Sequence, residues 1–201
     1  MKICRYSLWL KVVLAVSLVG ILALTSCNLF YSKTITINKG IVHFSFERSE
    51  GYSVENSTIK DDSKDKYTHI IITGPVGEDS INSVIGIYVR YPSFNFPDSL
   101  ALWEYDMNMF KEFEGFETID CSPVIVTVDS TPGNECGFYY TETSDLNRDL
   151  PDLVPVEMIY KGVYFDYDGL IWGITMLSSL ADIEENRAHF DHILETFEIL
   201  D

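Results

Sequence analysis

Two β-forming runs separated by Asp168-Gly169 constrain the fold of this 201-residue chain more than any other feature of its sequence. Asp-Gly between two such runs is typical of a two-residue type I′ turn, in which both residues take a positive φ. The run after the turn, residues 170–177, is apolar on both of its faces. A strand of that kind is covered on both sides of its sheet. The sequence therefore predicts an antiparallel hairpin of residues 157–167 and 170–177 whose second strand is central.

Other runs predict further strands of the same sheet. Residues 41–47 alternate, with Val42, Phe44 and Phe46 on one face, which is the pattern of a half-buried strand. The polar stretch 55–66 is predicted to be a loop, and Thr131-Pro-Gly-Asn134 has the composition of a turn. The remaining β-rich runs are 67–73, 84–91, 124–128 and 138–143, with a further short strand at 34–38.

Two amphipathic patterns predict helices that pack on this sheet. The first opens at Asp98 or Ser99 as the N-cap, and its apolar residues recur at spacings of three and four up to Phe110. The second covers about residues 182–197, with one apolar face and one acidic face. The predicted fold class is therefore α+β, with a central antiparallel β-sheet flanked by helices.

The first 27 residues have the pattern of a secretory signal. Lys2 and Arg5 precede an apolar run of about 13 residues, whereas a membrane-spanning helix needs about 20. The run closes on Leu24-Thr-Ser-Cys27, which resembles the bacterial lipobox. That resemblance implies cleavage before Cys27 and attachment of fatty-acyl chains such as palmitate to it, and two or more chains anchor a protein stably. We expect a signal peptide at 1–26, a lipidated N-terminus and tether at 27–39, and one domain at 40–201.

The charge of the chain restricts its partners. It contains 31 Asp and Glu against 14 Lys and Arg, a formal net charge of −17. Nucleic acid is excluded as a partner, and an anionic lipid surface should repel the domain. We expect a bacterial-type cell membrane to hold the protein through Cys27, facing outside the cytoplasm, and a protein partner to present a basic or mixed face.

Residues with catalytic potential have simpler structural interpretations. Cys136 follows a turn and could act as a nucleophile, but no histidine lies near it in the sequence. His189 and His192 could share a metal ion with Asp191 or Glu195, but helical geometry favours two solvated histidines. No coherent catalytic set is present, so the sequence predicts a protein that is not an enzyme.

Calcium is the one cofactor that the acidic loops suggest. Asp145, Asn147 and Asp149 have the one-three-five spacing of a calcium loop. The pattern then departs from the template, with Leu150 where glycine makes the sharp turn and Val156 where the bidentate glutamate stands. Residues 61–65 depart from it similarly. Solvated loop acids are the favoured interpretation, and no cofactor is predicted.

Cys121 and Cys136 are the cysteines left after Cys4 and Cys27 are assigned to the signal and the anchor. If the turn lies at 132–133, Cys136 stands opposite residue 129, and Cys121 is roughly 26 Å further along that strand at 3.3 Å per residue. A disulfide needs Cα atoms within about 7 Å. Free thiols are therefore predicted, unless Cys121 lies in a loop that folds back.

The order of elements resembles that of the PsbP-like superfamily. The resemblance lies in residues 40–46, the helix start at Asp98-Ser99, the Asp168-Gly169 turn and the C-terminal run 190–200. It implies an α/β/α sandwich on a central antiparallel sheet, and an accessory role rather than catalysis. The expected function is a lipid-anchored, non-catalytic interaction module for a membrane-associated complex. The alternative is a solute-binding or divalent-cation-binding lipoprotein that uses the acidic loops.

Overall fold

The computed structural model describes residues 33–39, 42–55, 59–62, 65–77, 81–126, 131–142 and 155–200. Its helices are α2 (Ser99–Phe110) and α3 (Ile183–Thr196). Its strands are β1 (Lys33–Lys39), β2 (Val42–Arg48), β3 (Ser53–Glu55), β4 (Ile59–Asp62), β5 (Asp65–Val76), β6 (Asn82–Arg90), β7 (Glu114–Val126), β8 (Thr131–Glu142), β9 (Val156–Tyr167), β10 (Leu170–Ser179) and β11 (Glu198–Ile199).

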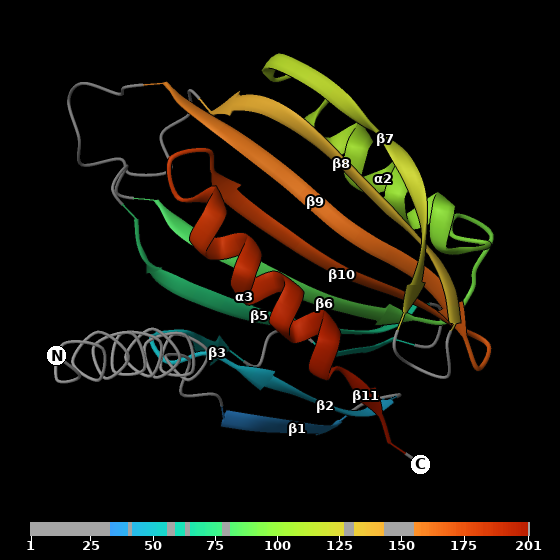
Figure 1. The fold of residues 1–201 in the computed structure, drawn as a ribbon. Helices are drawn as coiled ribbons and strands as arrows, with labels where there is room; N and C mark the ends of the chain where they lie inside the picture. Colours follow the sequence, from blue (N-terminus) through green and yellow to red (C-terminus); the bar gives the residue numbers. More distant parts are fainter. Residues whose placement is uncertain are drawn as a thin grey trace, which may run out of the picture.

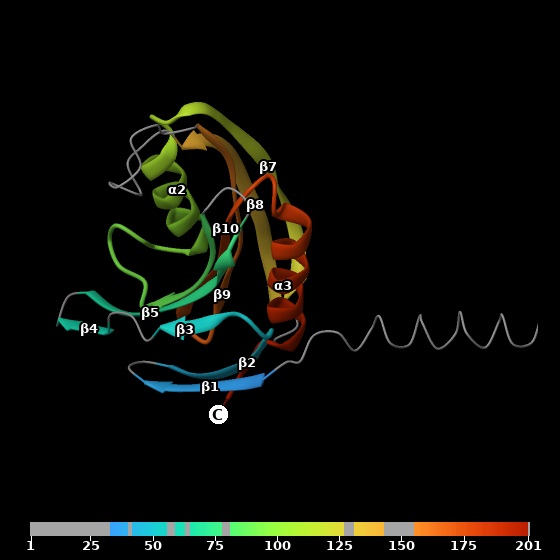
Figure 2. The ribbon, with the colours of Figure 1, turned by 90° about the vertical axis from the view of Figure 1, so that its left-hand side faces the viewer.

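The strands form a large and a small antiparallel sheet. The large sheet has the order β3-β5-β6-β10-β9-β8-β7, with β4 also paired to β5, and the small sheet has the order β1-β2-β11. Helices α2 and α3 cover opposite faces of the large sheet, and the small sheet lies beside α3 (Figure 1, Figure 2). The predicted α+β class with a central antiparallel sheet and flanking helices is confirmed.

The hairpin predicted around Asp168-Gly169 is present. Asp168 has φ 49° and Gly169 has φ 70°, which are the two positive values of a type I′ turn. The turn joins β9 to β10, and β10 lies between β9 and β6. The prediction that this apolar strand is central is therefore also confirmed.

Replacing Gly169 with valine should lower the free energy of unfolding by about 1–3 kcal/mol. Gly169 has a positive φ, and a β-branched side chain is strained in that region. Urea unfolding of the two proteins measures the difference. Asp168→Asn is the matched control, because asparagine tolerates positive φ, and it should leave stability nearly unchanged. Equal unfolding midpoints for Gly169→Val and the parent would contradict the turn assignment.

The alternation of side chains along β10 divides the molecule into two cores. Trp172, Ile174 and Met176 point to the α3 side, where they pack with aromatic residues of β2 and α3. Ile171 points to the α2 side and packs with Leu102 and a cluster of tyrosines and phenylalanines. Each helix therefore closes a separate apolar layer, which gives the sandwich its two sides.

The structure contradicts the predicted free thiols, because Cys121 and Cys136 form a disulfide with a Cα–Cα distance of 4.3 Å. The expected hairpin is present, but Thr131 is already in β8 and pairs with Val126, so residues 127–130 connect the strands. The register of β7 with β8 therefore differs from the one predicted from Pro132-Gly133. This register, with an irregularity between residues 119 and 122, brings Cys121 opposite Cys136.

Two polar stretches also differ from expectation. The predicted loop at 55–66 contains β4, which pairs with β5 from Ile59↔Thr68 to Asp62↔Asp65. Main-chain pairing at a sheet edge requires no apolar side chain, so hydrophobic periodicity does not reveal such a strand. The strand foreseen at 34–38 is β1, which pairs with β2 along its length. Folded structure therefore extends upstream of the predicted domain start at residue 40.

The predicted signal peptide at 1–26 and the lipidation site Cys27 lie outside the described residues. Within the described ranges, neither helix has the length and apolar character needed to cross a membrane.

Candidate functional site

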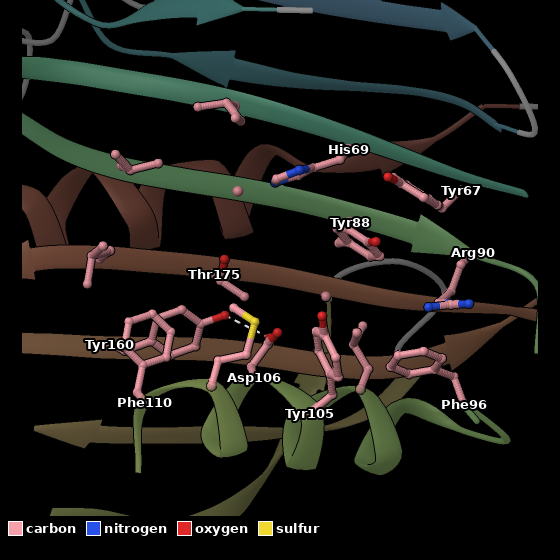
Figure 3. A pocket seen from close by; sticks show the side chains of 17 residues that line it. Tyr67, His69, Tyr88, Arg90, Phe96, Tyr105, Asp106, Phe110, Tyr160 and Thr175 are labelled. Carbon is pink, nitrogen blue, oxygen red and sulfur yellow. Dashed lines mark hydrogen bonds between the residues drawn. The ribbon is translucent and has the colours of Figure 1, made fainter. Parts of the chain in front are cut away.

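A groove of about 550 Å³ separates α2 from the neighbouring face of the large sheet (Figure 3). This volume falls in the range of about 300–1,000 Å³ that is typical of ligand sites. Its floor comes from β5, β6, β9 and β10, and α2 forms one wall. The lining residues are Tyr67, His69, Ile71, Val84, Gly86, Tyr88, Arg90, Phe96, Leu102, Tyr105, Asp106, Met109, Phe110, Tyr160, Gly173, Thr175 and Leu177.

Two glycines shape the floor of the groove. A Cβ on Gly173 would lie 3.2 Å from Leu102 Cδ2, so the missing side chain lets α2 approach β10 closely. Gly86 of β6 pairs with Thr175 of β10. Because Gly86 has no side chain, the groove reaches the main chain of the sheet at this point, beyond the part that α2 covers. The groove exists because α2 packs over β8, β9 and β10 and leaves the faces of β5 and β6 open.

Helix α2 is fixed to the sheet at its first turn. Asp98 is the N-cap, as predicted, and its Oδ1 accepts a 2.9 Å hydrogen bond from the Ala101 amide. Ser99 donates its hydroxyl to Asp166 Oδ2 of β9 at 2.7 Å. Trp103, one turn further, packs against Phe138 and Tyr164 with ring centroids 5.8 Å apart in each pair. These contacts hold the wall of the groove in a defined position.

Asp106 is the acidic residue of the groove. Its Oδ2 accepts hydrogen bonds from Tyr160 Oη at 2.7 Å and Tyr164 Oη at 2.8 Å. Burial raises the pKa of Asp106 above its usual value, while the two hydroxyl donors act to lower it. Burial also raises the pKa values of both tyrosines well above the usual range, so both remain donors. The site therefore holds a carboxylate against an aromatic wall.

The opposite part of the groove contains a row of neighbouring rings. Tyr88 stacks on Tyr67 with ring centroids 5.3 Å apart. It also packs at a tilt against His69, with ring centroids 5.1 Å apart. Burial raises the pKa of Tyr88 to about 12 and lowers the pKa of His69. At the end of the row, the Arg90 guanidinium lies 3.7 Å from the Phe96 ring centre. This part of the groove therefore offers aromatic rings to a bound group, with a buried guanidinium at its end.

Large apolar side chains are exposed on the α2 wall of the groove and in the segment that precedes α2. Phe94 is 100% exposed in the segment that leads into α2, and Tyr105 and Met109 of α2 are about half exposed. Tyr91 and Leu100 are exposed in the same region of the sequence. Exposed apolar side chains that gather around a concave site are typical of interaction surfaces.

The structure does not bring the candidate catalytic and metal-binding residues together into one site. Contrary to the prediction of a solvated residue, His189 is buried, with Nδ1 2.6 Å from Ser49 Oγ. His192 Nε2 lies 3.3 Å from Glu47 Oε2, a partner on β2. Cys136 is oxidised and is therefore no nucleophile. No group of three or more potential metal ligands occurs within the described residues. Asp145, Asn147 and Asp149 lie outside those residues.

Burial of His189 should make the stability of the protein depend on pH. Burial lowers the pKa of His189 below its unfolded value of 6.5, so the unfolded chain binds more protons once pH falls below that value. Stability should be complete above about pH 6.5 and should fall as pH drops through the folded pKa. Urea midpoints at about pH 8 and about pH 5.5 measure this change. His189→Asn should reduce the pH dependence, and an unchanged difference between the two pH values would contradict the assignment.

The groove was not predicted from the sequence, although one signal for it was present. Leu102, Asp106 and Phe110 are spaced by four and lie on one side of α2, so an acid interrupts an apolar stripe. The apolar stripe expected from spacings of three and four contains Leu100, Trp103, Met107 and Phe110. It shares only Phe110 with the groove side of the helix, and Leu100 is exposed in the structure. A charged residue on the buried side of a helix is the feature that would have marked the site.

No protein-family model and no curated protein matches the sequence. Solved structures do match. LpqN of Mycobacterium tuberculosis, which is involved in cell envelope biogenesis, matches at a TM-score of 0.50 with 12% identity, covering 85% of this chain and 92% of LpqN. Cyanobacterial PsbP (CyanoP) of Synechocystis sp. PCC 6803 matches at 0.51 with 8% identity, covering 84% of this chain and 92% of CyanoP. This similarity to CyanoP, together with the α2–sheet–α3 layering, shows that the chain has a PsbP-like fold.

Proposed function

We propose that this protein is a non-catalytic binding module, held by a lipid on Cys27 at the outer side of a bacterial-type cell membrane, that docks a protein partner in the groove beside α2. The observation that carries the proposal is the groove itself, an aromatic-lined concavity with exposed apolar side chains at its mouth. A small solute would fill the cavity but leave much of the exposed Tyr105 and Met109 side chains in water. A protein segment would cover the cavity and these side chains together, and this favours a macromolecular partner.

The groove is better suited to binding than to catalysis. His69, the one histidine among the lining residues, packs at a tilt against the Tyr88 ring, whereas Asp106 accepts hydrogen bonds from Tyr160 and Tyr164. These two titratable groups therefore contact different neighbours. A general acid–base mechanism requires such groups to act on one reacting atom. The involvement of LpqN in cell envelope biogenesis supports an envelope location for a chain of the same fold. The lipobox-like tetrad supports attachment to the membrane there.

Charge determines the kind of partner. A formal net charge of −17 favours a partner with a basic or mixed face, and it disfavours nucleic acid. Association should weaken as salt rises, because exposed charges are screened beyond about 8 Å at physiological ionic strength. Confinement to a shared membrane raises the effective concentration, so a weak contact suffices in the cell.

Replacing Cys27 with alanine should release the protein from the membrane fraction. The proposed tether between Cys27 and β1 contains no second apolar segment long enough to act as an anchor. Cell fractionation and immunoblotting measure the distribution. If a Cys27→Ala protein whose signal has been removed stays in the membrane fraction, the lipid-anchor proposal is wrong.

Crosslinking in intact cells before solubilisation tests the docking role. Met109→Asp, in the groove wall, and Phe94→Asp, two residues before the lining residue Phe96, should each reduce capture of a defined membrane or exported protein at least about tenfold. Ile125→Asp is the matched control, because Ile125 is 69% exposed but lies on β7, outside the groove. Equal loss in all three variants, or none in the groove variants, would reject the groove as the interface.

A further inference from the structure

The Asp106 carboxylate is incompletely satisfied by the protein. Both tyrosine hydroxyls donate to Oδ2, whereas Oδ1 accepts no hydrogen bond from the described residues. No lysine, arginine or histidine in the described part of the chain forms an ion pair with Asp106. A carboxylate in a partly dry site is costly without a counter-charge. The fold does not require that charge, because a neutral amide oxygen could accept the same two hydrogen bonds.

The surroundings of Asp106 suit a cation on an apolar stem. Figure 3 shows its carboxylate between Tyr160 and Tyr105, with Thr175 and Tyr88 on the sheet side of the groove. Aromatic faces attract cations electrostatically, most strongly where water is displaced. Apolar surface also packs the methylene groups of a long basic side chain while its charged tip remains with polar groups. Met109 and Phe110 supply such surface on the same wall.

We propose that the groove receives a lysine or arginine side chain of the docked protein, with its cationic tip at Asp106 Oδ1 and its stem between the α2 wall and the sheet. This inference rests on the proposed function, for which it specifies the recognised group. Charge complementarity supports it at two levels, since the whole molecule is strongly acidic and Asp106 carries an uncompensated charge inside the groove.

Arg90 determines where in the groove the cation lies. Its guanidinium is held on the Phe96 ring, and Figure 3 shows this pair at the opposite end of the groove from Tyr160. Like charges repel, so a basic side chain is directed away from Arg90 and towards the part of the groove beside Asp106. The two charged groups thus give the groove a direction, with a cation-accepting end and a cation-repelling end.

A direct titration tests the site with n-butylammonium, which has the same charged group and stem as a lysine side chain. The full chain in detergent micelles carries ¹³C-methyl methionine, and the Met109 signal, identified through Met109→Leu, reports on the groove wall. We expect a saturable shift with n-butylammonium and none with 1-butanol, its neutral counterpart. Asp106→Asn should weaken n-butylammonium binding at least about tenfold. The 1-butanol comparison does not depend on the folding of any variant.

Two results would overturn the assignment. One is binding of n-butylammonium that is equal in Asp106→Asn or is matched by 1-butanol. The other is capture of the partner in intact cells that is unaffected by Asp106→Asn, which would identify any amine site as one for a free small amine. Failure of the docking proposal alone would give another pair of results. Phe94→Asp would leave capture of the partner unchanged, while n-butylammonium would still bind in an Asp106-dependent way.

Discussion

Replacing Trp172 with alanine is expected to lower the free energy of unfolding by about 3–5 kcal/mol, the usual cost of emptying a large aromatic site in a core. Trp172 is 1% exposed and lies near the start of β10. Its ring packs against three phenylalanine rings. The distances between ring centroids are 5.8 Å to Phe44 of β2, 5.9 Å to Phe165 of β9 and 5.7 Å to Phe197 after α3. One side chain therefore connects the two sheets and the end of a helix.

Trp172→Phe is the control that separates the loss of packing from the removal of an unpaired donor. The indole Nε1 of Trp172 is buried without a hydrogen-bond partner among the described residues, which costs free energy. Phenylalanine removes that donor and keeps a ring in the site, so it should cost clearly less than alanine. Urea unfolding at fixed pH measures both variants. A cost below about 1 kcal/mol for Trp172→Ala would show that this core is not the one that stabilises the fold.

Removing the Cys121–Cys136 disulfide should cost about 3 kcal/mol. The bond closes a loop with a sequence separation of 15, and a cross-link of that size restricts the unfolded chain by about this amount. The double variant Cys121→Ala, Cys136→Ala should therefore unfold at lower urea concentration. A reducing agent should destabilise the parent protein by a similar amount and leave the double variant unchanged. A parent that is insensitive to reduction would contradict the bond.

Local signals account for the parts of the fold that the sequence predicted. Asp168-Gly169 determines its own turn, and Asp98 caps a helix through an amide three residues away. The β7–β8 register depends instead on which of two adjacent segments forms the connection. Pro132-Gly133 suggested one position, but Thr131 already pairs with Val126. Because the predicted cysteine state was derived from that register alone, the error carried over to the disulfide.

The groove was harder to predict because it depends on residues from several separate elements. Gly86 and Gly173 are ordinary strand residues until α2 is placed above them, and Asp106 is an ordinary helix acid until Tyr160 reaches it. These residues are separated widely in the sequence, and tertiary packing brings them together. The acidic loops were prominent in the sequence because their residues are adjacent, whereas a site built from several elements has no such local pattern.

The small sheet imposes an order on assembly. β2 lies between β1 and β11, and the Glu47 amide donates to Thr196 Oγ1 across a separation of 149 residues. A chain that is threaded N-terminus first through a membrane pore cannot complete this pairing until residues 196–199 have emerged. Until then Phe44 and Phe46, which are fully buried in the folded protein, lack the neighbours that shield them from water. Contacts between such distant segments form slowly, so in a chain exported as proposed the apolar face of β2 would be exposed to chaperones until the C-terminal residues arrive.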